Sequence, residues 1–231
     1  MKRFWKEVSI VEAEDGWRVL LDGRALKTVG GRPQVLPTES LARAMAEEWA
    51  AQGEEVDPGL FIYRDLTDFA LDVVAPARTE QIADLLRYAE TDTLCYRAEP
   101  DEHLHGRQNE VWEPLLKAAE QRYDVYFERV AGVLHRPQPE ATLRRLQSVL
   151  EAQDDFALSS LKTMASLAAS LTLALTALHA ETSAEELWDA ANLEEDWQAE
   201  LWGKDAEAME HRARRLSAFA SAAEFLRLSR R

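Results

Sequence analysis

The sequence predicts an α+β protein in which a small N-terminal, antiparallel β-rich domain precedes a larger, mainly α-helical domain. Two observations predict this class. Before about residue 37, short β-branched runs alternate with glycine-containing turns, as in consecutive hairpins. From Thr38 onward, apolar residues recur at intervals of three and four, the spacing of one helix face. We therefore expect an N-terminal domain over residues 1–75, including one helix, and a helical domain over residues 76–231.

Three short strands are expected in the N-terminal domain. The first covers residues 8–11 and is followed by a turn at Asp15-Gly16. The second covers residues 17–21, and Asp22-Gly23 gives another hairpin signal before a third strand at residues 26–29. Strands this short, joined by turns this tight, predict an antiparallel meander.

Most of the remaining chain is expected to be helical. Thr38 or Ser40 can cap a first helix whose apolar face includes Leu41 and Trp49. Further helices are expected over residues 64–74, 76–88, 108–123, 139–150, 156–180, 183–202 and 205–228. Residues 93–96 and 125–127 are expected to be extended.

Composition narrows the classes of partner. The chain has 46% hydrophobic residues, enough for a core, and a net charge of −15 from 42 acidic and 27 basic side chains. Such a charge disfavours nucleic acid and anionic membranes as partners. It is compatible with a protein that avoids self-association, and we expect a monomer, or with a partner that carries basic patches. Residues 163–180 are uncharged and nearly long enough to span a membrane, but their serine, threonine, histidine and alanine content favours a buried helix.

Candidate residues for catalysis or metal binding are few. Cys95 is the only cysteine, which excludes an internal disulfide and favours a reducing compartment, and its apolar neighbours favour a buried thiol. His103 and His105 would suit a metal if they lay on a strand, but no further cysteine or histidine is nearby. The alternative function is thus a small-molecule enzyme with a pocket near these three residues. Gly30-Gly31 lacks a phosphate-loop context, and we expect no cofactor and no metal.

The predicted helix that ends at Trp202 carries two stripes of different character. On a helical wheel, Leu193, Trp197 and Leu201 form a core stripe. A separate stripe consists of Glu195, Gln198 and Trp202. An aromatic side chain beside polar groups is typical of a binding surface. The alternative is that this stripe packs on another helix of the same domain, since tryptophan is highly buried on average.

Blocks of sequence spread over nearly the whole chain carry a family resemblance. They are Arg3-Phe4-Trp5-Lys6, residues 17–24, Lys27-Thr28, Leu36-Pro37-Thr38, residues 48–52, Asp57-Pro58, residues 88–92 and 94–98, Gln108, Trp112, Pro114, Leu193-Glu194-Glu195, Gln198 and Trp202-Gly203. In this order they resemble the ATP synthase assembly chaperones that bind the alpha subunit of the soluble catalytic sector.

The resemblance implies a chaperone rather than an enzyme. Such a protein covers the alpha-subunit surface that is exposed before assembly, prevents its aggregation, and is displaced by the beta subunit. The implied partner-binding residues are Glu194, Glu195, Gln198 and Trp202, and the family's functional glutamate corresponds to Glu194 or Glu195. The resemblance does not separate these two, and the helical wheel favours Glu195. The first family block begins at Arg3, without a preceding targeting leader, so a bacterial cytoplasmic protein is expected.

Overall fold

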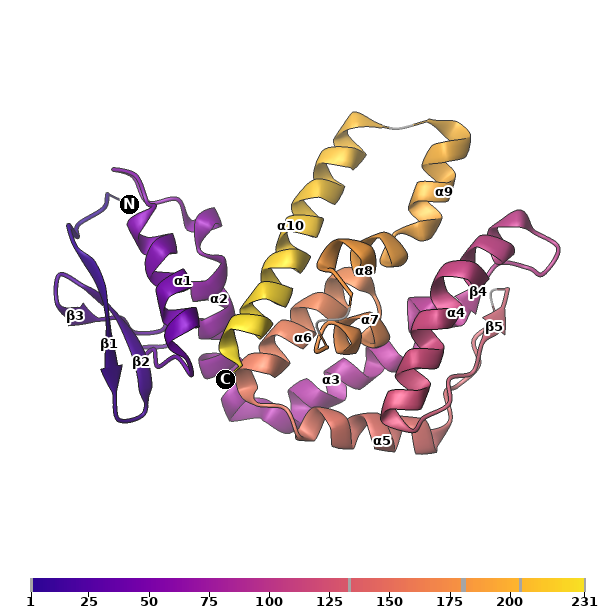
Figure 1. Ribbon diagram of the computed structural model, residues 1–231, viewed down its shortest axis with the longest axis horizontal. Helices are drawn as coiled ribbons and strands as arrows, with labels where there is room; N and C mark the ends of the chain where they lie inside the picture. The colour runs from indigo at the N-terminus through magenta and orange to yellow at the C-terminus, as the bar shows by residue number, and fades with distance from the viewer. Residues whose placement is uncertain (1, 133, 180–181, 204, 231) are drawn as a thin grey trace. The chain divides into compact units, whose positions relative to one another are not determined.

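The computed structural model describes residues 2–132, 134–179, 182–203 and 205–230 (Figure 1). The chain divides into two compact units. Unit 1 comprises Met1–Arg78, Asp154–Ser160 and Glu224–Arg231, and unit 2 comprises Thr79–Gln153 and Leu161–Ala223. A small antiparallel sheet near the N-terminus is followed by a larger helical region, which confirms the predicted α+β class.

The sheet of unit 1 is a three-stranded antiparallel meander in the order β1-β2-β3. It consists of β1 (Val8–Ala13), β2 (Gly16–Leu21) and β3 (Arg24–Ala25). The expected third strand at residues 26–29 is wrong in position, because Thr28 starts a tight turn in which its carbonyl accepts a hydrogen bond from the Gly31 backbone N–H at 2.9 Å. Ladder pairing therefore gives way to an isolated bridge between Lys27 and Pro33.

Helices complete unit 1. Of the two predicted caps, Thr38 is the one that begins helix α1 (Glu39–Ala50), and its hydroxyl accepts from the Leu41 backbone N–H. A 3₁₀ turn, Pro58–Leu60, precedes α2 (Ile62–Phe69), which continues through a π-helical turn (Ala70–Val74) and a 3₁₀ turn (Ala75–Ala77). The core includes Trp5, Trp49 and Phe61. The ring centroids of Trp5 and Trp49 lie 5.0 Å apart, and those of Trp49 and Phe61 lie 4.5 Å apart. These rings thus join the start of the chain to α1, where the Trp5 indole N–H also donates to the Trp49 carbonyl.

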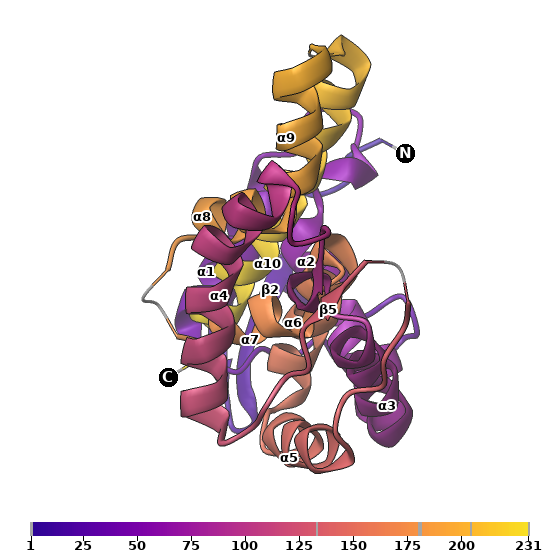
Figure 2. The same ribbon diagram turned by 90° about the vertical axis from the view of Figure 1, so that its right-hand side faces the viewer.

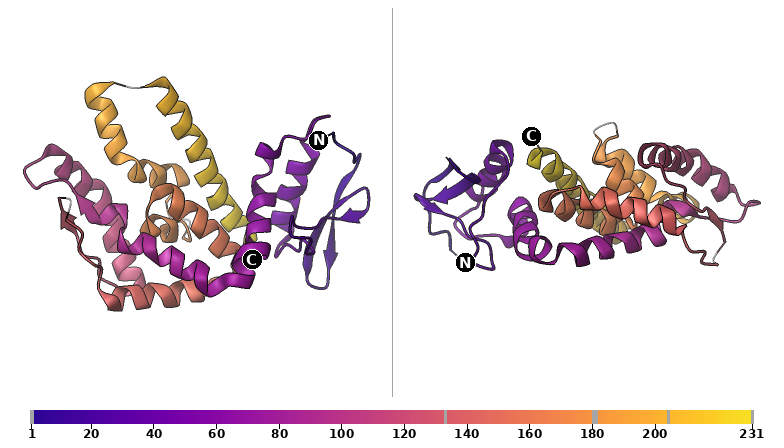
Figure 3. Two further views of the ribbon diagram at one scale, coloured as in Figure 1. Left: turned by 180° about the vertical axis from the view of Figure 1, so that it is seen from behind. Right: turned by 90° about the horizontal axis from the view of Figure 1, so that it is seen from below.

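Unit 2 is almost entirely helical. The elements of unit 2 are α3 (Arg78–Glu90), β4 (Tyr96–Arg97), α4 (His103–Tyr123), β5 (Val130–Ala131), α5 (Glu140–Glu151), α6 (Asp155–Ala168), α7 (Leu171–Thr176), α8 (Ala184–Ala191), α9 (Leu193–Trp202) and α10 (Ala206–Ser229). One end of each of three helices, α3, α6 and α10, belongs to unit 1. Helices α4 and α7 lie side by side (Figure 2). Helix α9 and the first half of α10 run in opposite directions as a helical hairpin (Figure 3).

Two helices predicted as continuous are each broken in two. Within residues 156–180, α6 ends where Ala169 takes φ +49°, and Ser170 then caps α7 through the Leu173 backbone N–H. Within residues 183–202, Asn192 separates α8 from α9, and its side chain donates to the Trp188 carbonyl at 2.7 Å. Residue 180 lies outside the described residues. No described helix is both long and apolar enough to cross a membrane.

The segments around α4 also differ from the sequence-based expectations. Residues 93–96 are not extended throughout, because the buried Asp92 carboxylate accepts from the Leu94 backbone N–H and starts a 3₁₀ turn, Thr93–Cys95. Burial raises the pKa of Asp92, whose other oxygen accepts from the Thr172 backbone N–H at the start of α7. The expected strand at residues 125–127 is wrong, and the strand that pairs with β4 lies at Val130–Ala131.

Candidate partner-binding site

Helix α9 carries all four residues implied by the family resemblance, and it is buried only at its first residue, Leu193. Trp197 is half-buried and Leu201 is 58% exposed, so the predicted core stripe is wrong beyond Leu193. The physical reason is that the helix packs on α4 through its first turn, and its later turns leave the core. The helix ends at Gly203, which has φ +93°, as the sequence predicts for a residue just past a helix end.

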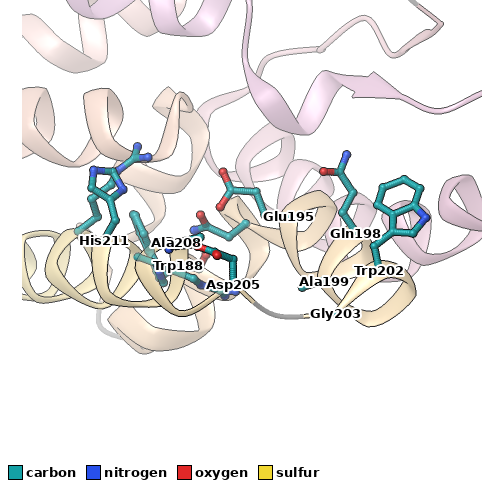
Figure 4. A pocket seen from close by; sticks show the side chains of 12 residues that line it. Trp188, Glu195, Gln198, Ala199, Trp202, Gly203, Asp205, Ala208 and His211 are labelled. Atoms are coloured by element: carbon teal, nitrogen blue, oxygen red, sulfur yellow. Dashed lines mark hydrogen bonds between the residues drawn. The ribbon is translucent and has the colours of Figure 1, made fainter.

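The second stripe of α9 points away from the core. Glu195 and Gln198 are exposed, and Trp202 is 78% exposed. The alternative that this stripe packs on another helix of the same domain is therefore wrong for Trp202. Figure 4 shows the three side chains on the same side of α9. The helical wheel thus grouped these residues correctly.

The same three residues line a groove of about 440 Å³ between α9 and the first half of α10. Trp188, His211 and Arg215 also line it. A second hollow of about 300 Å³ shares Glu195 and Arg212 with the groove and adds apolar side chains of α10, among them Met209 and Leu216. The two helices of the hairpin therefore leave open hollows between them.

Arg212 connects the helices around this groove. Its guanidinium donates to Asp196 of α9 at 2.8 Å and to Asp189 of α8 at 3.3 Å. Arg215, one turn further along α10, donates to the Leu167 carbonyl at 2.7 Å. Both guanidinium groups are thus bonded within unit 2, so neither is an unpaired cation in the groove.

The two adjacent glutamates of α9 have different surroundings. Glu194 accepts a hydrogen bond of 2.6 Å from the side-chain amide of Gln108, a buried residue of α4. The Gln108 oxygen in turn accepts from the Ala98 backbone N–H at 2.8 Å. Glu195 makes no hydrogen bond or ion pair with any described residue. Sequence reasoning missed the role of Gln108, because it lies 86 positions from Glu194 and no local pattern joins them.

The surface of α8 and α9 is strongly anionic. Residues 184–203 contain seven carboxylates and no lysine, arginine or histidine. Most of these carboxylates have partners, such as Glu186 in the capping box with Ser183 and Glu200 at 3.9 Å from Arg107. Three acidic residues in the first turn of α9 also favour the helix by opposing its positive N-terminal end. Glu195 contributes its charge to the groove without a partner in the part of the chain that the structure describes.

The alternative function, an enzyme with a pocket near Cys95, His103 and His105, would need an accessible thiol or two histidines on a strand, and the structure places these residues differently. Cys95 is buried, and burial raises the pKa of its thiol well above the ordinary range, which disfavours the nucleophilic thiolate. His103 and His105 lie on the first turn of α4 instead of on a strand, about 200° apart around the helix. His105 contacts the Asn109 side chain at 3.0 Å. Within the described part of the chain, no group of three or more histidine, cysteine or acidic residues is placed to hold a metal.

Comparisons with known proteins agree with the sequence resemblance. The family model described as ATP12 chaperone protein matches residues 2–120. The crystal structure of Atp12 from Paracoccus denitrificans superposes with a TM-score of 0.94 at 37% identity, covering 99% of this chain and 98% of that one. Atu1473 from Agrobacterium tumefaciens gives 0.93 at 39% identity, with coverages of 99% and 85%.

A more distant relative is a mitochondrial protein. Protein atp12 of Schizosaccharomyces pombe is 26% identical over 222 residues, covering 90% of this chain and 76% of the relative. The family model ends before α9, whereas the structural matches extend over nearly the whole chain, including α9. The chain belongs to the ATP12 chaperone family.

Proposed function

We propose that the protein is an assembly chaperone that binds the unassembled alpha subunit of the ATP synthase catalytic sector. It shields the subunit interface of its client from aggregation until the beta subunit replaces it. Membership of the ATP12 chaperone family supports this proposal. The observation that carries it is the exposed, partly apolar end of α9, where Trp202 lies near Glu195 and Gln198, two side chains without a hydrogen-bond partner among the described residues.

This surface has the composition of a contact surface for another protein. Tryptophan contributes strongly to binding when a partner covers it, and polar groups around it fix the orientation of the partner. Leu201 and Met209 add exposed apolar surface on the two helices of the hairpin. A client surface that is apolar before assembly would be covered by these side chains, which lowers its tendency to aggregate.

The four residues of α9 take two roles in this proposal. Glu195, Gln198 and Trp202 contact the client, because they are exposed on the same side of the helix. Glu194 supports binding indirectly, because its hydrogen bond with Gln108 fixes α9 to α4. Glu195 is therefore the glutamate that we assign to client recognition, as the helical wheel favours.

We also propose that the chaperone works without catalysis or cofactor, as a monomer in the bacterial cytoplasm. The net charge of −15 opposes self-association. Cys95 is a free thiol, as is usual in a reducing compartment. Two of the structural relatives are bacterial proteins.

The test is capture of isolated alpha subunit. Light scattering of refolding alpha subunit should fall as the protein is added, without ATP, and the two should co-purify. Addition of beta subunit should then release the chaperone. An unchanged scattering signal at molar excess, together with no co-purification, would refute the proposal.

A further inference from the structure

We infer that the free edge of strand β1 accepts an extended segment of the client polypeptide, which extends the sheet of unit 1 by one strand. Alternate apolar side chains of this segment fill a hollow between β1 and α1. The inference rests on the proposed function, in which the client is the unassembled alpha subunit. It goes further by assigning a second contact surface, on elements other than α9, and by naming the conformation of what binds there.

The hydrogen bonds at the start of β1 determine which main-chain groups face β2. The Glu7 carbonyl accepts from the Asp22 backbone N–H at 3.0 Å. In an antiparallel pair, the residues that bond to the partner strand alternate along each strand. Since the register of β1 and β2 is unbroken, Ser9 and Val11 bond to β2, and the residues between them do not.

The main-chain groups of Val8, Ile10 and Glu12 therefore point away from β2. Val19, which lies opposite Ile10, agrees with this pattern, because its carbonyl turns to the other side of β2 and accepts from the Leu26 backbone N–H at 3.0 Å. No described residue bonds to the outward groups of β1, and no described strand or bridge other than β2 pairs with it. The edge thus offers N–H donors and carbonyl acceptors to another strand.

This edge lacks the features by which native proteins protect free edges. Such features are charged side chains, proline, bulges and very short strands. Residues 8–11 contain no charge and no proline, and β1 pairs with β2 residue for residue over its full length. The opposite edge of the sheet is formed by β3, which has only two residues. The edge of β1 is therefore a template for a strand of another chain, a recurring mode of peptide recognition.

A hollow beside the edge determines which side chains fit. It has a volume of about 330 Å³ and is lined by Val8 and Ile10 of β1 and by Arg43, Ala46, Glu47 and Ala50 of α1. Residues that lie directly opposite each other in a sheet project to the same face. Side chains of the added strand that lie opposite the two β1 residues therefore enter the hollow. Its aliphatic and alanine lining favours apolar side chains at every second position of the segment.

The charged groups near the hollow favour a basic residue in the segment. Arg43 is bonded to Glu39, one turn earlier on α1. The side chains of Glu47 and Glu12 are exposed and bond to no described residue. A lysine or arginine beside the apolar positions complements these carboxylates. A second copy of this chain is disfavoured as the occupant, because it would bring like carboxylates and a second net charge of −15 to the edge.

The first test separates the main chain of Ile10 from its side chain. Ile10→Ala keeps the outward N–H, whereas Ile10→Pro removes it and leaves the hydrogen bonds with β2 in place. We expect both full-length variants to fold, and Ile10→Pro to bind purified alpha subunit at least about 10-fold more weakly than Ile10→Ala. Ala25→Pro is the control on the edge formed by β3. Ala25 lies opposite Leu20, whose main chain faces β1, so this variant also removes an outward N–H and should bind normally.

The second test detects the added strand on the wild-type protein. Amide hydrogen exchange, resolved to single residues by mass spectrometry, should be slow at Ser9 and Val11 and fast at Val8, Ile10 and Glu12 in the free protein. Alpha subunit should slow exchange at the three outward amides, because a paired strand accepts hydrogen bonds from them. Contact through side chains alone would leave the alternating pattern unchanged.

The third test fills the hollow. The double variant Ala46→Leu/Ala50→Leu should bind alpha subunit at least about 10-fold more weakly, because larger side chains occupy the space for those of the segment. Ser40→Leu adds similar bulk at an exposed position of α1 that does not line the hollow, and it should bind normally. Equal binding by the double variant and the wild type would overturn the inference.

The outcomes separate this inference from the proposed function. If the wild-type protein does not bind alpha subunit, the proposed function fails, and the inference fails with it. If the wild type binds, equal binding by Ile10→Pro and Ile10→Ala, or an unchanged exchange pattern on β1, overturns the inference and leaves the proposed function standing. A wild-type dimer in sedimentation that Ile10→Pro abolishes would make the edge an interface between two copies, which also overturns the inference.

Discussion

Helices α4 and α9 are neighbours in unit 2, and the partners of Glu113 and Glu120 on α4 differ from the surroundings of one residue of α9, Glu195. On α4, Glu113 and Glu120 bind the guanidinium of Arg129, and Glu113 also binds the buried Arg97. On α9, Glu195 has no partner among the described residues. We interpret the contrast as follows: the paired polar groups of α4 hold unit 2 together, whereas Glu195, beside the exposed Trp202, is the group that we propose contacts a client protein. The predictions below test each side of this contrast.

The largest expected effect concerns Cys95, which lies beside the paired groups of α4. Its thiol is buried and its pKa is raised by burial. A thiol-specific disulfide reagent at pH 8 should therefore react at least about a thousand-fold more slowly with the native protein than with the protein in urea, since reaction requires opening of the structure. Rapid reaction of the native protein would contradict the closed interior and would favour the alternative enzyme site.

Arg129→Met should cause the next largest effect. It leaves Glu113 and Glu120 without their shared cation in a partly buried site, and we expect a loss of about 2–3 kcal/mol in the free energy of unfolding, measured by urea denaturation. Burial alone would raise the pKa of Glu113, but hydrogen bonds and charge from Arg129 hold it below its ordinary value.

The sign of the pH dependence follows from that lowered pKa. The stability gained from the Glu113–Arg129 pair is present above the ordinary glutamate pKa of about 4.3 and is lost as the pH falls through the lower native value. The difference in the free energy of unfolding between wild type and Arg129→Met should therefore become smaller in acid. If this difference becomes larger in acid, the Glu113–Arg129 pair is not the cause of the lost stability.

Glu195→Gln tests the other side of the contrast. The side chain is exposed and bonds to no described residue, so the free energy of unfolding should change by less than about 0.5 kcal/mol. Loss of a charge-assisted contact should weaken capture of alpha subunit by roughly 10- to 100-fold. Unfolding of the helical unit by this substitution would make Glu195 a structural residue.

Glu194→Gln should weaken capture of alpha subunit less than Glu195→Gln does. It removes the charge from the hydrogen bond with Gln108, and we expect a loss of about 1 kcal/mol in the free energy of unfolding, with only a small change in capture. Normal capture by Glu195→Gln together with poor capture by Glu194→Gln would reverse the two roles that we assign.

The fold was predictable where a local pattern decides the structure. The apolar spacing and Thr38 cap identified α1, and the glycine turns identified the first hairpin. The break at Ala169 was not predictable, because an alanine with positive φ has no local sequence signal and is held by tertiary contacts such as the hydrogen bonds of its carbonyl with Thr93. The division into domains of residues 1–75 and 76–231 stays a prediction.

The candidate site was predictable in part for a similar reason. Helical spacing is local, so it placed Glu195, Gln198 and Trp202 on one side of α9 without knowledge of the fold. Spacing cannot tell which side of a helix meets the core, and Leu201 was therefore wrongly expected to be buried. The groove with α10 and the Gln108–Glu194 hydrogen bond depend on distant segments and required the structure.

The most direct test of the central claim compares two exposed aromatic residues. Trp202 of α9 is 78% exposed and Phe4 of unit 1 is 70% exposed. Replacing either residue with alanine should therefore change the unbound protein to a similar extent. The dissociation constant for purified alpha subunit should be measured by titration calorimetry for Trp202→Ala and Phe4→Ala. We expect Trp202→Ala to weaken binding by at least about 30-fold and Phe4→Ala to leave it nearly unchanged. Equal affinities for the wild type and Trp202→Ala would contradict the account.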